Sequence, residues 1–132
     1  DVFINVPVLK NHGLTGLTLS MKNLMGVCGG NRGQMHTGIG EKLADLTDYI
    51  RPELTVIDAY RVLTANGPSG GSLGDVRLAG KVIVSTDPVL ADSFACREMG
   101  VDPQSISYIA AALKKGLGKH EVSGERVLAV TA

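Results

Sequence analysis

Hydrophobic positions along the chain follow two different spacings. Continuous apolar runs rich in Val and Ile are typical of buried strands, and they occupy residues 2–8, 54–59, 81–85 and 126–131. Apolar residues that recur every three or four positions are typical of one helix face, and they occupy residues 15–25, 41–50, 87–99 and 102–116. The pattern therefore predicts four strands and four helices.

These elements follow one another in the order β-α-α-β-β-α-α-β. Strands that alternate with helices indicate an α/β fold, and we expect a mostly parallel sheet of about four strands with flanking helices, in two or three layers. The 132 residues suit a single domain, residues 1–132. Because the chain opens directly on a strand-like run, without a methionine or a signal-type segment, we expect a fragment of a longer protein.

Proline and glycine predict where helices begin and where loops lie. Asp87-Pro88 and Asp102-Pro103 each combine a capping aspartate with a proline suited to a first helical turn. Residues 26–40 contain six glycines and residues 64–80 contain five, so both stretches are predicted to be loops. Loops of this length in a compact domain are usually functional or mobile.

Composition and charge exclude several classes of function. Thirteen basic and thirteen acidic side chains cancel, so no nucleic-acid partner held by bulk positive charge is expected. Aromatic residues make up only 4% of the chain, too few for platforms that stack single-stranded bases. No apolar run approaches the ~18 residues of a membrane-spanning helix, and we expect no membrane partner and a cytoplasmic location.

Chemically active side chains gather after the predicted strands. Ligands of open α/β sheets bind at the carboxyl ends of the strands, and both glycine-rich loops are expected to close over that edge. The candidates there are Lys10, His12, Asp58, Tyr60, Arg61, Ser85, Thr86, Asp87, His36 and Asn66. A cation, an imidazole and a carboxylate would then share one site.

The leading hypothesis is a site for a small anionic molecule. Lys10, His12 and Lys22 are the predicted catalytic residues, because ammonium groups near a helix N-terminus bind carboxylates and phosphates and a histidine can act as general acid or base. The predicted ligand-binding residues are Thr18, Asn23, Asn66, Asp58, Asp87 and Asp92. For Lys22, the alternative is an ordinary solvated helix face.

A metal site is the second hypothesis. His12, His36 and Asp58 offer ligands that suit zinc or iron, although their spacing matches no short metal-binding motif. The alternative for both histidines is an ordinary loop side chain. Cys28 and Cys96 are too few for an iron–sulfur cluster, which usually takes four cysteines, so no cofactor is clearly encoded.

The three aspartates also have simpler roles. Asp58 either caps the loop after its strand or orients a lysine or histidine of the site. Asp87 is most simply a helix cap. Asp92 lies one turn into that helix among apolar neighbours, where a carboxylate needs a partner.

Five blocks of sequence contain most of these candidates. They are residues 6–16 (VPVLKNHGLTG), 18–26 (TLSMKNLMG), 51–59 (RPELTVIDA), 66–69 (NGPS) and 85–92 (STDPVLAD). In this order the blocks resemble the signature of the domain of unknown function 362 family, and the resemblance extends from residue 1 to about residue 118. The matching positions are Lys10, His12, Thr18, Lys22, Asn23, Gly26, Asp58, Asn66, Gly67, Pro68, Asp87, Pro88 and Asp92.

The resemblance implies that this chain is the C-terminal portion of the family's domain. Members are often described as iron–sulfur cluster-binding proteins, so an iron–sulfur module elsewhere in full-length relatives is expected, with this domain redox-linked to it. Some relatives are exported by a twin-arginine signal, which this chain does not contain. No reaction follows from the family's name.

Three functions are therefore open. The first is an anion-binding domain, the second a metal-binding domain, and the third a non-catalytic assembly module. A homodimer, or pairing with a missing N-terminal part, is also expected, because an incomplete α/β domain exposes sheet edge or core. A large exposed apolar patch would favour the assembly module.

Overall fold

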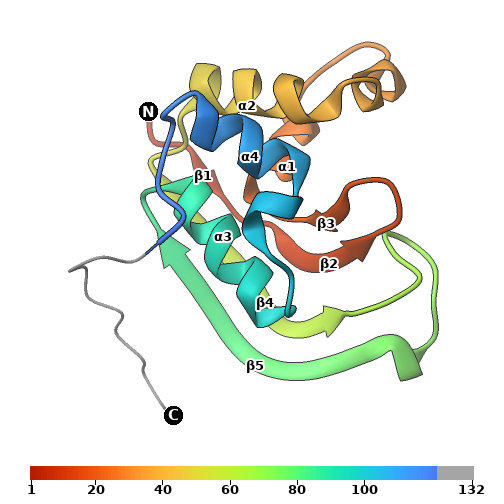
Figure 1. The fold of residues 1–132 in the computed structure, drawn as a ribbon. Coiled ribbons are helices and arrows are strands. Elements are labelled where there is room, and N and C mark those ends of the chain that lie inside the picture. Colours follow the sequence, from red (N-terminus) through yellow and green to blue (C-terminus); the bar gives the residue numbers. More distant parts are fainter. Residues whose placement is uncertain (122–132) are drawn as a thin grey trace.

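The computed structural model describes residues 1–121, so the strand predicted at 126–131 lies outside the described residues. One sheet contains five strands, β1 (Ile4–Asn5), β2 (Val8–His12), β3 (Gly16–Thr18), β4 (Leu54–Leu63) and β5 (Val76–Ser85). The α-helices are α1 (Ser20–Asn23), α2 (Ile39–Ile50), α3 (Pro88–Glu98) and α4 (Ser107–Lys114). Short 3-10 helices are η1 (Leu24–Val27), η2 (Arg32–His36), η3 (Leu73–Asp75) and η4 (Pro103–Ser105). The predicted α/β architecture is confirmed (Figure 1).

The sheet is built around β4. β1 and β2 lie one after the other along one edge of β4 and run parallel to it, with Val8 opposite Asp58. β5 lies along the other edge and runs antiparallel, with Ser85 opposite Thr55. β3 pairs with β2 as its antiparallel neighbour. The carboxyl ends of β2 and β4 therefore lie at one end of the sheet, and the carboxyl end of β5 lies at the other.

The helix predicted over residues 15–25 is wrong in its first half. Gly16 has a φ of +75°, and residues 16–18 pair with β2 to form β3. Only then do α1 and η1 follow. Leu17, Met21 and Leu24 are all buried, as the helical spacing predicts, because a strand followed by a short helical turn buries the same positions.

The helix start predicted at Asp87 is confirmed, whereas Asp102 caps only the 3-10 helix η4 and α4 begins later, at Ser107. Asp87 Oδ1 accepts hydrogen bonds of 2.9 Å from the backbone N–H groups of Val89 and Leu90 at the start of α3. Asp102 accepts one from the N–H of Gln104 at 3.0 Å, before η4. Within residues 1–121, no helix has both the length and the apolar character needed to cross a membrane.

The described helices lie on one face of the sheet (Figure 1). Ile57, Ala59 and Ile83 point to that face and are buried in the core. Alternate residues point to the opposite side, which we call the open sheet face. Its apolar side chains Ile4, Val6, Val8, Val82 and Val84 are between 46% and 61% exposed.

Candidate functional site

Four basic side chains come together at the carboxyl end of β2. Lys10 and His12 are two residues apart on this strand and so point to the same side of it. Lys22 comes from α1, and His36 comes from η2. The rings of His12 and His36 stack, with centroids 6.4 Å apart and planes inclined by 20°. We call Lys10, His12, Lys22 and His36 the basic cluster.

Burial and like charge act together on this cluster. Burial lowers the pKa of His12, and the positive charges of Lys22, His36 and Lys10 lower it further. Burial likewise lowers the pKa of Lys22, with a second contribution from Lys10. Within residues 1–121, the ammonium group of neither lysine has an ion pair or a hydrogen-bond partner. The positive charge of the cluster is therefore not neutralised by the described part of the chain, and a bound anion would relieve the repulsion.

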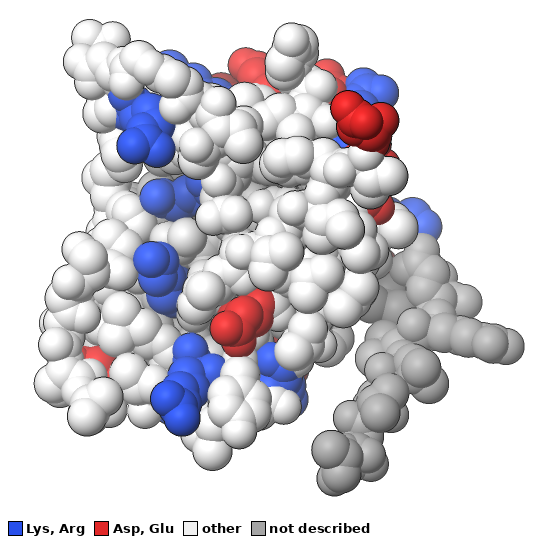
Figure 2. Space-filling model, turned by 180° about the vertical axis from the view of Figure 1, so that it is seen from behind, with Lys and Arg blue, Asp and Glu red and all other residues white. Residues whose placement is uncertain are grey.

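The view from behind the molecule shows how charged side chains are distributed over that face (Figure 2). Lys and Arg side chains are spaced along one side of this face, and few Asp or Glu side chains lie among them. Lys10, Lys22 and His36 are half-buried, and only His12 is almost fully buried, with 8% of its surface exposed. A ligand can therefore reach the cluster from solvent.

The turn after β2 fixes the orientation of His12. Its Nδ1 accepts hydrogen bonds from the backbone N–H groups of Leu14 at 3.2 Å and Thr15 at 3.3 Å. A backbone N–H can only donate, so Nδ1 must carry its lone pair toward the turn. The neutral ring then carries its hydrogen on Nε2.

The loop that contains Asn66 and Gly67 is hydrogen-bonded to β2 and to the turn that follows it. The N–H of Gly67 donates to Asn11 Oδ1 at 3.1 Å, and the N–H of Gly13 donates to Gly67 O at 3.4 Å. A Cβ at position 67 would lie 2.0 Å from Asn11 O, so only glycine fits there. The Asn66 side chain itself donates to Asp75 at 3.2 Å, so the loop contacts the turn through Gly67 and not through this side chain.

Thr18 adds an unsatisfied hydroxyl to the cluster. It lies directly opposite Lys10 in the β2–β3 ladder, and cross-strand partners point to the same face. Thr18 is 9% exposed, and within residues 1–121 its buried Oγ1 has no hydrogen-bond partner. Because buried polar groups are usually paired, this oxygen marks an unfilled hydrogen-bonding position beside Lys10. Asn23, in contrast, is exposed and donates to Asn5 Oδ1 at 2.8 Å.

Asp92 supports the site from the interior. Its Oδ1 accepts from the backbone N–H of Ser20 at 2.7 Å and from Ser20 Oγ at 2.5 Å, and its Oδ2 accepts from the N–H of Met21 at 3.0 Å. These bonds anchor the start of α1, which carries Lys22. The carboxyl is fully buried, and burial raises its pKa to about 7. Asp92 is thus a positioning residue.

The remaining acidic candidates lie away from the cluster. Asp58 is in the middle of β4, opposite Val8 and Val82, where it is exposed and accepts from the N–H of Tyr60 at 2.8 Å. Residues 85–87 follow an antiparallel strand and lie at the opposite end of the sheet. The sequence predicts these residues at the same end of the sheet as Lys10, because it treats β5 as parallel to β2 and β4. This prediction is wrong, since β5 is antiparallel to β4.

The described residues do not assemble the predicted metal ligands. Within residues 1–121, no group of three or more His, Cys, Asp or Glu side chains could hold a metal ion. The structure brings His12 and His36 together, but not with Asp58. Cys28 is a half-buried free thiol, and Cys96 is a buried one whose pKa burial raises to about 12.

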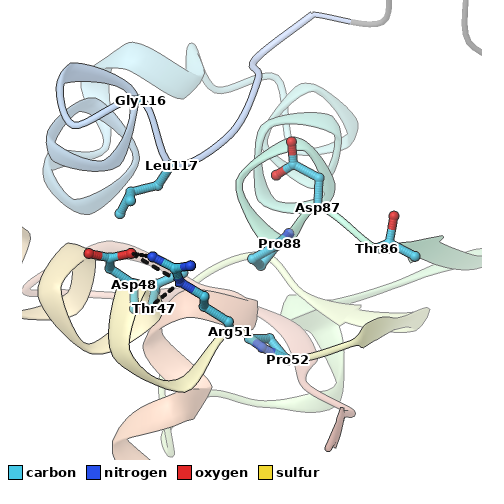
Figure 3. Close-up of a pocket in the computed structure, with 9 residues that line it drawn as sticks. All are labelled: Thr47, Asp48, Arg51, Pro52, Thr86, Asp87, Pro88, Gly116 and Leu117. Atoms are coloured by element: carbon cyan, nitrogen blue, oxygen red, sulfur yellow. Dashed lines mark hydrogen bonds and ion pairs between the residues drawn. The ribbon is translucent and has the colours of Figure 1, made fainter.

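A hollow of about 420 Å³ lies at the opposite end of the sheet, between the end of α2 and the start of α3 (Figure 3). Its charged side chains already have partners. Arg51 is paired with Asp48, and Asp87 caps α3 and accepts from the N–H of Lys119 at 3.0 Å. With its charges satisfied internally, this hollow is less suited to an ionic ligand than the basic cluster.

The comparisons with known proteins agree with the sequence resemblance. A family model described as a domain of unknown function (DUF362) matches residues 1–97. The thylakoid-associated protein sll1697 of Synechocystis sp. is 31% identical over 125 residues, which cover 89% of this chain and 38% of that protein. The chain therefore spans about two fifths of that relative. No solved structure matches.

Proposed function

Because this chain belongs to the domain of unknown function 362 family, whose name states no reaction, we propose its function from the basic cluster. The domain binds a small anionic molecule at the carboxyl end of β2. The observation that carries this proposal is the convergence of Lys10, His12, Lys22 and His36 without an acidic partner within residues 1–121. Like charges that are partly buried together repel one another, and a bound anion reduces this unfavourable free energy.

The side chains of the cluster suit both binding and electrostatic catalysis. Two ammonium groups supply charge, and the His12 N–H supplies a directed hydrogen bond. Hydrogen bonds from charged donors to an anion are about twice as strong as neutral ones. In an enzyme the same groups would stabilise negative charge that develops on a bound substrate, which would make Lys10, His12 and Lys22 catalytic residues.

The alternative functions, a metal site at the histidines or an iron–sulfur cluster in this chain, have less support. Nε2 of His12 carries the hydrogen of the neutral ring, and a metal would require a lone pair at that atom. The two cysteines do not provide an iron–sulfur ligand set, since Cys96 is buried and its pKa is raised to about 12. A redox link would therefore need an iron–sulfur module on another polypeptide segment, as the resemblance implies.

Titration calorimetry with inorganic phosphate tests the proposal. We expect the wild-type chain to bind phosphate and Lys22→Met to weaken binding by about tenfold or more, because a charged hydrogen bond is worth roughly 1.5–3 kcal/mol. Lys114→Met is the matched control, since Lys114 is exposed in the last turn of α4. Equal affinities in all three proteins, or no binding by the wild type, would contradict the proposal.

The open sheet face supports assembly as a second candidate function. Five apolar side chains on it are about half exposed, and contiguous apolar patches on a domain often mark interfaces. We propose a second copy of this chain as the occupant, because a formal net charge of zero puts no net repulsion between copies and most homo-oligomers are two-fold dimers. Light scattering after gel filtration should show a dimer that Val82→Lys dissociates, and a wild-type monomer would refute this candidate.

The cellular location is a proposal of the same kind. The sequence predicts a cytoplasmic protein, whereas the name of the Synechocystis relative associates that protein with thylakoids. Fractionation of the source cells, followed by immunodetection, separates the two: recovery with membranes would contradict the cytoplasmic prediction.

A further inference from the structure

The two stacked histidines make opposite backbone contacts through their Nδ1 atoms. Nδ1 of His12 accepts from the N–H groups of Leu14 and Thr15. Nδ1 of His36 instead lies 3.1 Å from the carbonyl oxygen of Gly33. A carbonyl oxygen can only accept, so this Nδ1 must carry a hydrogen and donate it.

These backbone contacts determine what each Nε2 can do. In a neutral imidazole one nitrogen is a donor and the other an acceptor. His12 must therefore carry its hydrogen on Nε2, while Nε2 of His36 must carry a lone pair. Within residues 1–121 neither Nε2 has a hydrogen-bond partner, and Nε2 of His12 is not among the fully buried unpartnered atoms. Both atoms are thus free to meet a ligand.

We propose that His12 and His36 form a donor–acceptor pair that selects an anion with one hydroxyl hydrogen. The inference rests on the proposed function, because it names the chemistry of the anion held by the basic cluster. The lysines and the His12 N–H would contact the charged oxygens, and the His36 lone pair would accept the hydroxyl hydrogen. Hydrogen phosphate and the 2-hydroxycarboxylates share this pattern, whereas sulfate and acetate do not have the hydroxyl.

The selection has a simple physical origin. Sulfate and hydrogen phosphate have the same shape and charge, so the lysines attract both equally. They differ at one oxygen, which carries a hydrogen in hydrogen phosphate and a lone pair in sulfate. A sulfate oxygen opposite Nε2 of His36 places two acceptors together, so neither has a hydrogen-bond donor. An acceptor without a donor in a partly buried site is unfavourable. The acceptor therefore rejects the anion that lacks the hydrogen.

Affinities at pH 8, where hydrogen phosphate predominates, test the ligand class. The wild-type chain should bind phosphate at least about tenfold more tightly than sulfate, and His36→Phe, which keeps an aromatic ring against His12, should bring the two affinities together. Glycolate should likewise bind more tightly than acetate, and its affinity compared with that of phosphate shows which of the two classes the site prefers. Equal binding of phosphate and sulfate by the wild type, or an unchanged ratio in His36→Phe, would overturn the inference.

Long-range nitrogen–proton NMR spectra of the ligand-free chain test the histidine assignment separately. We expect hydrogen on Nε2 of His12 and on Nδ1 of His36, and the same tautomer in both rings would overturn the inference whatever the binding data show. If no anion binds while the tautomers are opposite, the proposed function and the ligand class are refuted and the histidine assignment holds. The amide spectrum of His36→Phe confirms that the variant folds.

Discussion

The buried carboxyl of Asp92 makes a sharp prediction about stability and pH. Asp92 is fully buried and holds the start of α1 through three hydrogen bonds. Its pKa rises from 3.8 to about 7, chiefly through burial, against the opposing effect of those hydrogen bonds. The perturbation that tests this reasoning is Asp92→Asn, which removes the titration and keeps the size of the side chain.

The sign and the size of the effect follow from linkage. Because the folded state holds the Asp92 proton more tightly than the unfolded state, the contribution of this group is fully present below pH 3.8 and is lost as the pH rises through about 7. The whole shift corresponds to about 4 kcal/mol. From pH 5 to pH 8 the loss is about 3 kcal/mol, a large part of the stability of an ordinary domain.

Urea unfolding at half-unit steps between pH 5 and pH 8 measures this loss. We expect the stability of the wild-type chain, relative to Asp92→Asn, to fall by about 3 kcal/mol over this range and then to level off. His12, whose pKa is lowered, acts in the opposite direction, since its contribution to the stability of the fold is lost as the pH falls. That contribution is common to both proteins and cancels in the difference.

Asp102→Asn is the matched control. Asp102 also caps a helical turn, through the N–H of Gln104, but it is exposed. We expect this variant to keep the wild-type pH profile. Parallel profiles for the wild type and Asp92→Asn would refute the reasoning, because they would show that the buried carboxyl does not titrate in this range.

Three further predictions concern Gly67, Lys22 and the two cysteine thiols. Gly67→Ala should lower the free energy of unfolding by about 1–3 kcal/mol, because the added Cβ would lie 2.0 Å from Asn11 O; an unchanged urea midpoint would contradict this. Lys22→Met should leave the melting temperature unchanged or raise it, since it removes a half-buried cation whose pKa burial lowers; a clear fall in the calorimetric melting temperature would show a structural role instead. A thiol reagent should label Cys28 in the native chain and Cys96 only after unfolding, because Cys96 is buried and its pKa is raised to about 12; labelling of two thiols in the native chain would contradict the burial.

Local signals in the sequence were enough to predict several elements. The aspartate–proline pairs at residues 87–88 and 102–103 mark helical turns, because capping depends only on adjacent backbone groups. The apolar spacing at residues 41–50 predicts α2, which begins only two residues earlier. The α/β class follows from the alternation of these elements and is confirmed.

Long-range pairing explains what the sequence did not predict. Residues 16–18 form a strand because β2 lies beside them, and their helical spacing contains no trace of that partner. The direction of β5 depends on its hairpin with β4, which moves residues 85–87 to the far end of the sheet. The sequence predicts His36 near the carboxyl ends of the strands and as a metal ligand, but no local signal shows that it stacks on His12.

The most direct measurement of the anion site is an amide NMR titration of the nitrogen-15-labelled chain with inorganic phosphate. The account predicts saturable shifts confined to the segments around Lys10 and His12, around Thr18 to Lys22, and around His36. Shifts centred instead on the hollow between α2 and α3, at Thr47–Pro52 and Thr86–Pro88, or a spectrum that phosphate does not change, would contradict it.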